Sequence, residues 1–142
     1  MPGKIAILYP SIVMALMTVA VILGLGARRF LAVQRRAFNP RYYVTFNGES
    51  PEPPSLRQHS RHVQNHFEVP PLFHLAVWGT YVAGEVTTAT IVAAWFFVAA
   101  RAGHSLVHLT YNTVIHRFAM FGLGVFAALF LWIHLLMSVS HA

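Results

Sequence analysis

The sequence predicts an all-α protein, a bundle of four transmembrane helices, and three observations support this class. Hydrophobic residues make up 56% of the 142 residues, whereas only 10% are charged. The mean hydropathy is +0.56. About a quarter of the residues of a water-soluble domain are charged, so this composition excludes a soluble enzyme. Long apolar runs recur along the chain and approach the roughly 20 residues that a helix needs to cross a bilayer core.

The first predicted helix covers residues 5–38. Its first part, residues 5–27, holds no charged side chain and is longer than the apolar core of a cleaved signal peptide, which is about 7–15 residues. Arg28 and Arg29 follow this run in place of a small-residue cleavage site. A membrane-spanning helix is therefore expected. Residues 39–55 are rich in proline and are predicted to form a loop.

Three more helices are expected within the single domain 1–142, and they cover residues 56–83, 88–112 and 116–139. The first of these is polar at its start and apolar at its end. Pro70 and Pro71 should kink it where it enters the lipid, because proline removes a backbone donor and clashes with the preceding turn. From Phe118 to Val139 the last helix carries His134 as its one ionisable side chain.

The positive charge of the chain indicates its orientation in the membrane. Several arginines follow the first helix, namely Arg28, Arg29, Arg35, Arg36 and Arg41. The connection between the second and third helices offers only Glu85. The positive-inside rule places the first loop in the cytoplasm and both termini on the other side. The net charge of +6 is thus interpreted as a topology signal, and no nucleic-acid partner is expected. The absence of cysteine excludes disulfides and thiolate metal sites.

Arg61, Asn65 and Glu68 lie where charged groups approach the lipid. They are spaced four and three residues apart, so on a continuous helix they share one face. One interpretation is that arginine and glutamate pair with each other. The other is that Asn65 and Glu68 hold amide and amine groups of a polar ligand while Arg61 binds a carboxylate. Ionisable groups within a membrane are costly and often functional.

A second polar stripe lies on the predicted third helix. Arg101, His104 and His108 follow one another at spacings of three and four, and Tyr111 lies one turn further along. The two histidines have the spacing of a metal-ligand pair, but no carboxylate accompanies them on that helix. A haem axial ligand is a further interpretation. Hydrogen bonds to a neighbouring helix are the alternative. No metal ligand is therefore assigned.

Taken together, these motifs resemble the MAPEG family, the membrane-associated proteins in eicosanoid and glutathione metabolism. Arg61, Asn65 and Glu68, followed by Pro70, resemble the signature of the family's second helix. Arg101 and His104, with a polar residue at His108, resemble the third helix, and Arg117 follows in the order of a catalytic arginine. The basic segment 35–40 also resembles the end of the family's first helix. The stretch 104–117 is most similar to bacterial members.

The resemblance implies a homotrimer of four-helix subunits in a bacterial inner membrane. Glutathione would lie between adjacent subunits, toward the cytoplasmic side. Arg61, Asn65 and Glu68 would hold the peptide and Arg101 a carboxylate, with His104, His108 and Tyr111 completing the glutathione site. Arg117 would face the sulfur as the catalytic residue. A thiol with a pKa near 8.5 is mostly protonated at neutral pH, and a guanidinium nearby favours the nucleophilic thiolate.

Two departures from the family pattern bear on this role. The chain has Val69 and His108 where catalytic branches carry tyrosines. Arg117 follows Arg101 by sixteen residues, which is about 160° around an unbroken helix, so it needs a break near Asn112 or a neighbouring subunit to join the site. Its alternative role is to anchor the start of the last helix at the membrane interface.

Three classes of function remain open. The first is a glutathione-dependent transferase or peroxidase acting on a lipophilic electrophile. The second is a non-catalytic MAPEG-like subunit, which binds lipid or packs within a larger membrane complex. The third is a haem or metal protein that uses His104 and His108. Membrane lipids are expected partners in all three.

Overall fold

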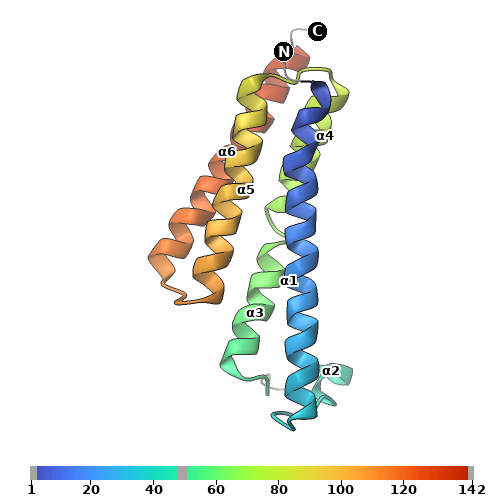
Figure 1. The fold of residues 1–142 in the computed structure, drawn as a ribbon, viewed down its shortest axis with the longest axis vertical. Coiled ribbons are helices and arrows are strands. Elements are labelled where there is room, and N and C mark those ends of the chain that lie inside the picture. The colour runs from blue at the N-terminus through green and yellow to red at the C-terminus, as the bar shows by residue number, and fades with distance from the viewer. Residues whose placement is uncertain (1–2, 48–50, 141–142) are drawn as a thin grey trace.

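The computed structural model describes residues 3–47 and 51–140, and within them the protein is all-α, with no strand. A 3-10 turn, Lys4–Ile7, leads directly into the first long helix. The helices are α1 (Leu8–Gln34), α2 (Tyr42–Thr45), α3 (Pro54–Asn65), α4 (Pro70–Val82), α5 (Thr88–Leu109) and α6 (Val114–Ser140). Figure 1 shows the start of α1 and the end of α6 at the same end of the molecule. The predicted all-α class is confirmed.

Three segments of the described chain are long and apolar enough to cross a membrane: Lys4–Gln34, Thr88–Leu109 and Val114–Ser140. Within each segment an 18-residue stretch has a mean hydropathy of 2.4, 1.4 and 2.1, respectively. Many of their large apolar side chains point outward, among them Leu23, which is 67% exposed, and Phe126, which is 72% exposed. Such surfaces are costly in water and suit contact with lipid. With 13 residues, α4 is too short to span a bilayer by itself.

The expected helix 56–83 is divided into α3 and α4. Residues 66–69 separate them, and α4 begins with Pro70, whose fixed φ suits the first position of a helix. Pro70 and Pro71 have no backbone N–H groups, so the hydrogen bonds that would continue α3 through this point are missing. The spacing predicts that Glu68 shares a helical face with Arg61 and Asn65. This prediction is wrong, because Glu68 lies in the connection between α3 and α4. Both helices pack against α1.

Two other helices end earlier than expected, and each is followed within three residues by a residue whose backbone is in the left-handed region. Gln34 is the last residue of α1, and the chain then turns at Arg36, whose φ is 54°. Leu109 is the last residue of α5, and Asn112 has a φ of 51°. Asparagine tolerates this conformation, and its backbone N–H donates to the Val107 carbonyl at 2.8 Å. The chain therefore reverses direction between α5 and α6.

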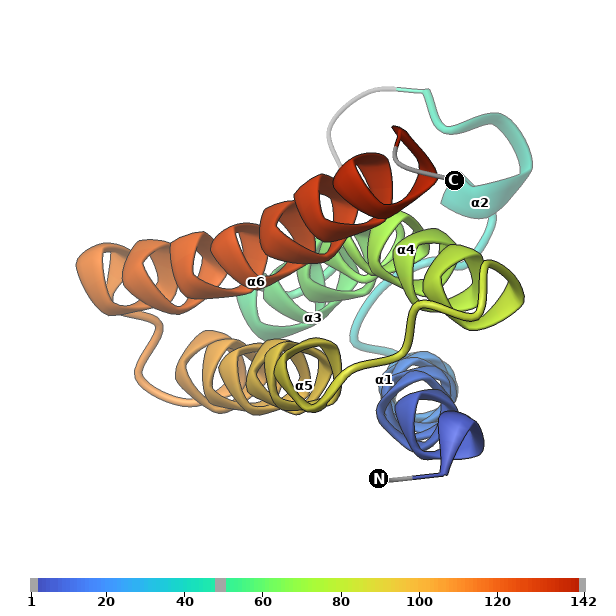
Figure 2. The same ribbon diagram turned by 90° about the horizontal axis from the view of Figure 1, so that it is seen from above.

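The main apolar core joins α1, α4, α5 and α6. Phe73 and Phe97 stack with ring centroids 4.0 Å apart, and Met14 and Leu131 are fully buried. Burying a side chain of this size contributes about 1.5–3 kcal/mol. In the view of Figure 2, α5 and α6 lie side by side, and they form the most extensive helix pair of the fold. A smaller cluster of Leu25, Phe38 and Leu56 joins α1 to α3. The core thus fixes the α5–α6 hairpin relative to α3.

Candidate functional site

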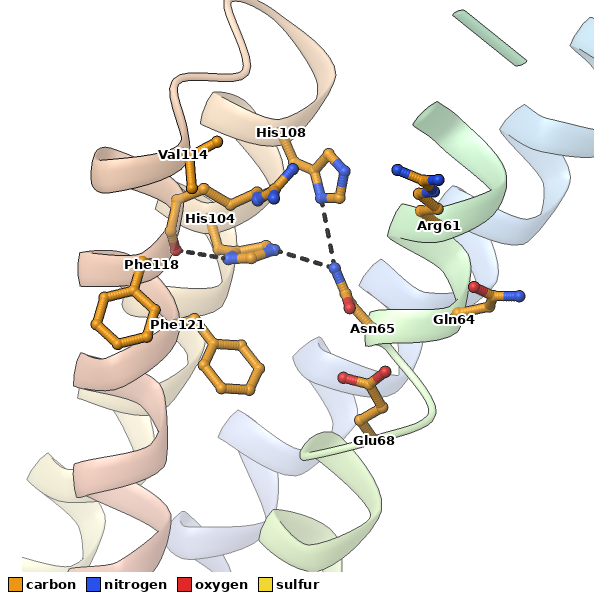
Figure 3. A pocket seen from close by; sticks show the side chains of 10 residues that line it. Arg61, Gln64, Asn65, Glu68, His104, His108, Val114, Phe118 and Phe121 are labelled. Atoms are coloured by element: carbon orange, nitrogen blue, oxygen red, sulfur yellow. Dashed lines mark hydrogen bonds between the residues drawn. The ribbon is translucent and has the colours of Figure 1, made fainter. Parts of the chain in front are cut away.

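A pocket of about 420 Å³ lies between α3 and the end of the α5–α6 hairpin (Figure 3). Six of the eight residues predicted for the site line it. The full lining consists of Arg61, Gln64, Asn65, Glu68, His104, His108, Val114, Arg117, Phe118 and Phe121. Polar and charged groups come from both sides of the pocket, whereas the phenylalanines on α6 add an apolar wall. The two polar stripes of the sequence therefore meet in one cavity.

Asn65, the last residue of α3, connects that helix to α5. Its Nδ2 atom lies 3.5 Å from Nε2 of His104 and 3.4 Å from Nδ1 of His108. Figure 3 shows dashed lines from the amide nitrogen to both rings, with Gln64 pointing away from them. Asn65 is half-buried, whereas Arg61 and Gln64 are exposed. The α3 side of the pocket thus has one amide held in place and two polar side chains that face solvent.

Glu68 provides the only carboxylate on the pocket wall. It is exposed, and the ion pair found among the described residues joins other groups, Arg29 and Glu52. Glu68 nevertheless attracts the guanidinium of Arg101. An exposed carboxylate beside a positive environment is suited to bind the amine of a ligand.

Arg117 reaches the pocket because the chain reverses between α5 and α6. Its Nη1 donates to Oδ1 of Asn112 at 2.8 Å, and its backbone carbonyl accepts from Nδ1 of His104 at 3.1 Å. On one unbroken helix, Arg117 and Arg101 would point in nearly opposite directions. The helix break instead places Arg117 beside His104 and His108 in the same subunit.

Arg101 and Tyr111 are predicted site residues that do not line the pocket. Arg101 is only 1% exposed, and its Nη2 donates to the backbone carbonyl of Asn65 at 2.9 Å. It lies behind the wall and supports the end of α3. Tyr111 is 59% exposed, and its hydroxyl group is 3.1 Å from Nδ1 of His116. The end of α5 at Leu109 turns Tyr111 away from the cavity.

Two histidines that the sequence did not single out, one on α3 and one directly after it, pack behind the pocket. His62 is fully buried, and its ring centroid is 5.0 Å from that of His108 and 5.8 Å from that of His104. The ring of His66 is 4.9 Å from that of His62. The spacing of His59, His62 and His66, one helical turn apart, is the signal in the sequence for a buried histidine face.

A separate polar cluster connects the end of α1 to the loop before α3. Arg29 Nε donates to Oε1 of Glu52 at 2.7 Å, and the Tyr43 hydroxyl donates to the same oxygen. Burial alone would raise the pKa of Glu52, but the hydrogen bonds from Arg29 and Tyr43 outweigh it and lower that pKa. Burial and the bond to Glu52 raise the pKa of Tyr43 to about 12. This cluster ties the loop to the bundle, away from the pocket.

The sequence profile of the MAPEG family matches residues 7–137. A comparison with curated proteins finds no match. MAPEG proteins generally use glutathione, and the family includes glutathione transferases and peroxidases. The match covers nearly the whole chain, including every residue that lines the pocket. It agrees with three apolar helices that mark an integral membrane protein. On this evidence the chain belongs to the MAPEG family.

Proposed function

We propose that the chain is an integral membrane transferase or peroxidase that uses glutathione against a lipophilic electrophile. The observation that carries the proposal is the pocket itself, which gathers two guanidiniums, a carboxylate and two side-chain amides beside an apolar wall. Glutathione has two carboxylates, one amine and two peptide groups, so its charges and hydrogen-bonding groups match these side chains in kind. Family membership supports the same ligand.

The binding roles follow from the chemistry of each side chain. Arg61 binds a carboxylate of the tripeptide, since its planar guanidinium can donate two parallel hydrogen bonds. Glu68 binds the amine, and Asn65 binds the peptide backbone. Arg101 is a positioning residue in this proposal, because it is buried and holds the Asn65 carbonyl. His104 and His108 border the same space.

Arg117 stabilises the thiolate of bound glutathione in this proposal. Its guanidinium is held by Asn112, so its positive charge is fixed before the ligand binds, which is the condition for electrostatic stabilisation of a developing anion. The thiolate sulfur then forms a bond to an electrophilic carbon of the second substrate, and the displaced electron pair leaves with the departing group or moves to a neighbouring atom that takes up a proton. With a hydroperoxide the sulfur attacks the terminal oxygen, the O–O bond breaks and an alcohol leaves after taking up a proton. A second glutathione then reduces the resulting sulfenic acid, which gives glutathione disulfide and water. Phe118 and Phe121 provide an apolar surface next to this point.

The proposal includes a four-helix subunit that assembles as a homotrimer in a bacterial inner membrane. Together α3 and α4 supply the fourth crossing, although α4 alone is short. Two observations support this topology. The start of α1 and the end of α6 lie at one end (Figure 1), as an even number of crossings requires. An apolar groove of about 730 Å³ also runs along α5 and α6 between Thr88 and Phe130, which is a surface for lipid or for a neighbouring subunit. The pocket opens toward the cytoplasm in this orientation.

Calorimetric titration of the detergent-solubilised protein with glutathione tests the proposal. We expect saturable binding, which Glu68→Gln weakens at least about tenfold, because a charged hydrogen bond contributes about 1.5–3 kcal/mol. Glu85→Gln is the matched control, since Glu85 is exposed and lies in the α4–α5 connection. Absence of binding to the folded wild type, or equal weakening by both variants, would contradict the proposal.

The second candidate is a non-catalytic subunit that binds lipid or packs within a larger membrane complex. One observation favours it: Tyr111 faces away from the pocket and contacts His116, so the described pocket contains no tyrosine hydroxyl to assist at the sulfur. This candidate predicts a folded, lipid-associated protein without glutathione binding. The same titration separates the two.

A further inference from the structure

Three buried imidazoles from two helices converge at the inner side of the pocket. His62 on α3 is fully buried, and His104 and His108 on α5 are each 2% exposed. One nitrogen from each ring can be chosen so that all three lie within 4.8 Å of one another. We propose that His62, His104 and His108 form a binding site for a divalent transition-metal ion. This site goes beyond the proposed glutathione chemistry and does not depend on it.

The environment of His62 is the strongest argument. Both of its ring nitrogens are buried and have no hydrogen-bond partner among the described residues. Leaving a buried polar group without a partner costs about 1–3 kcal/mol, so a histidine with two such nitrogens is unfavourable as packing alone. Other buried histidines differ: Nε2 of His59 lies 3.0 Å from the Val21 carbonyl, and Nδ1 of His66 lies 3.0 Å from the Thr18 hydroxyl. A metal ion gives one nitrogen of His62 a partner.

His104 is already oriented as a metal ligand. Its Nδ1 lies 3.1 Å from the carbonyl oxygen of Arg117, and a carbonyl only accepts, so Nδ1 carries the proton. Nε2 therefore carries the lone pair, which accepts from Nδ2 of Asn65 at 3.5 Å (Figure 3), and a bound metal ion would take the place of this amide donor. Metal-binding histidines usually donate their second nitrogen to a carbonyl or carboxylate in this way. The α6 backbone thus fixes the tautomer of an α5 ligand.

The donor set determines the class of metal. Three imidazoles suit zinc, copper, nickel or cobalt, whereas magnesium and calcium require oxygen ligands. The positive charge of Arg101 acts on His62 and opposes any cation, so affinity must come from nitrogen coordination, as it does for zinc and copper. Nitrogens around a tetrahedral ion at about 2.0–2.1 Å lie about 3.4 Å apart. Because the three nitrogens lie within 4.8 Å of one another, binding requires the rings to rotate closer together.

The pocket provides both an entry path and a fourth coordination position. His104 and His108 line the cavity, whereas His62 lies behind them. An ion bound by all three rings therefore sits at the inner wall, where water or an anionic ligand can complete a tetrahedral shell. Three protein ligands with one open position is the arrangement of reactive zinc sites. The nearby guanidiniums of Arg101 and Arg117 favour an anion at that position.

The test is titration of the detergent-solubilised protein with cobalt(II) chloride in the absence of glutathione. The protein must be purified without a polyhistidine tag, because a tag binds the same ions. Tetrahedral Co²⁺ with nitrogen ligands gives visible absorption bands that free Co²⁺ lacks. We expect these bands to saturate at one ion per chain and to disappear when zinc displaces cobalt. Elemental analysis after dialysis against zinc gives the same stoichiometry independently.

His62→Gln removes one ligand without leaving a large cavity. We expect it to weaken cobalt binding by more than about a hundredfold, since even outer-shell changes cost 10- to 100-fold. His108→Gln should act equally from α5. His59→Gln is the matched control: it alters a buried histidine on the same helix that is not part of the cluster, and binding should persist. No cobalt bands with folded wild type, or an unchanged titration in folded His62→Gln, would overturn the proposal. Because glutathione is absent, either outcome leaves its binding to be judged separately.

Discussion

The guanidinium of Arg101 on α5 donates to the backbone carbonyl of Asn65, the last residue of α3, at 2.9 Å. This bond crosses from the α5–α6 hairpin to the break between α3 and α4. It holds the carbonyl of the residue whose side-chain amide lies between His104 and His108. One buried arginine thus positions the wall of the pocket that faces both histidines.

Replacing Arg101 should destabilise this wall. Arg101→Gln shortens the side chain and removes the donor to Asn65, and an unpartnered buried carbonyl costs about 1–3 kcal/mol. We expect a lower thermal midpoint in detergent together with weaker glutathione binding. Arg101→Lys should recover only part of the loss, because an ammonium lacks the planar fork. Arg35→Gln, at an exposed position, is the control, and an Arg101→Gln midpoint equal to that of this control would refute the role.

Replacing Arg117 should affect the sulfur more than binding. With Arg61, Asn65 and Glu68 still holding the tripeptide, Arg117→Ala should leave glutathione affinity largely intact. Loss of the charge should raise the pKa of the bound thiol by about one to two units, each worth about 1.4 kcal/mol. Ultraviolet absorbance of the thiolate, titrated against pH, measures this shift. Asn112→Ala, which removes the anchor of the guanidinium, should give a smaller shift in the same direction. An unchanged titration in Arg117→Ala would remove the activating role.

The cluster of Arg29, Tyr43 and Glu52 predicts a pH dependence of stability. The pKa of Glu52 in the folded protein lies below its ordinary value of 4.5. Its stabilising contribution is therefore complete above pH 4.5 and is lost as the pH falls below that value through the folded-state pKa. Glu52→Gln should lower the free energy of unfolding by about 1–3 kcal/mol at neutral pH and by less in acid. Thermal unfolding in detergent at both pH values measures this, with Glu85→Gln as the control. A deficit of equal size at both would contradict the ionic origin.

The topology can be tested by cysteine labelling, because the natural chain contains no cysteine. A membrane-impermeant maleimide should label Glu85→Cys in intact cells, since the positive-inside rule places the α4–α5 connection outside the cytoplasm. Asn47→Cys should react only after the membrane is permeabilised. Ala127→Cys, at a buried core position, should not react under either condition. Labelling of Asn47→Cys in intact cells would reverse the proposed orientation.

Much of the fold follows from local sequence patterns. The apolar runs around Leu16 and Phe126 predict long helices, because helix formation depends on nearby residues and a membrane leaves the backbone no other way to satisfy its hydrogen bonds. The effect of Pro70 and Pro71 is also local, although the helix is interrupted between Asn65 and Pro70 where only a kink is expected. The joint order of the motifs from the basic segment 35–40 to Arg117 indicated the family, which the match over residues 7–137 confirms.

The tertiary structure alone decides which polar side chains meet. The positions of Arg61 and Arg101 in the sequence do not predict that the side chain of Arg61 is exposed and that of Arg101 fully buried. That difference depends on how α5 packs against α3 and α6. The sequence indicated that Arg117 needed a break to join the site, and the left-handed turn at Asn112 supplies it. His62 meets His104 and His108 across two helices, and such contacts between distant parts of the chain are set by packing and not by any local period.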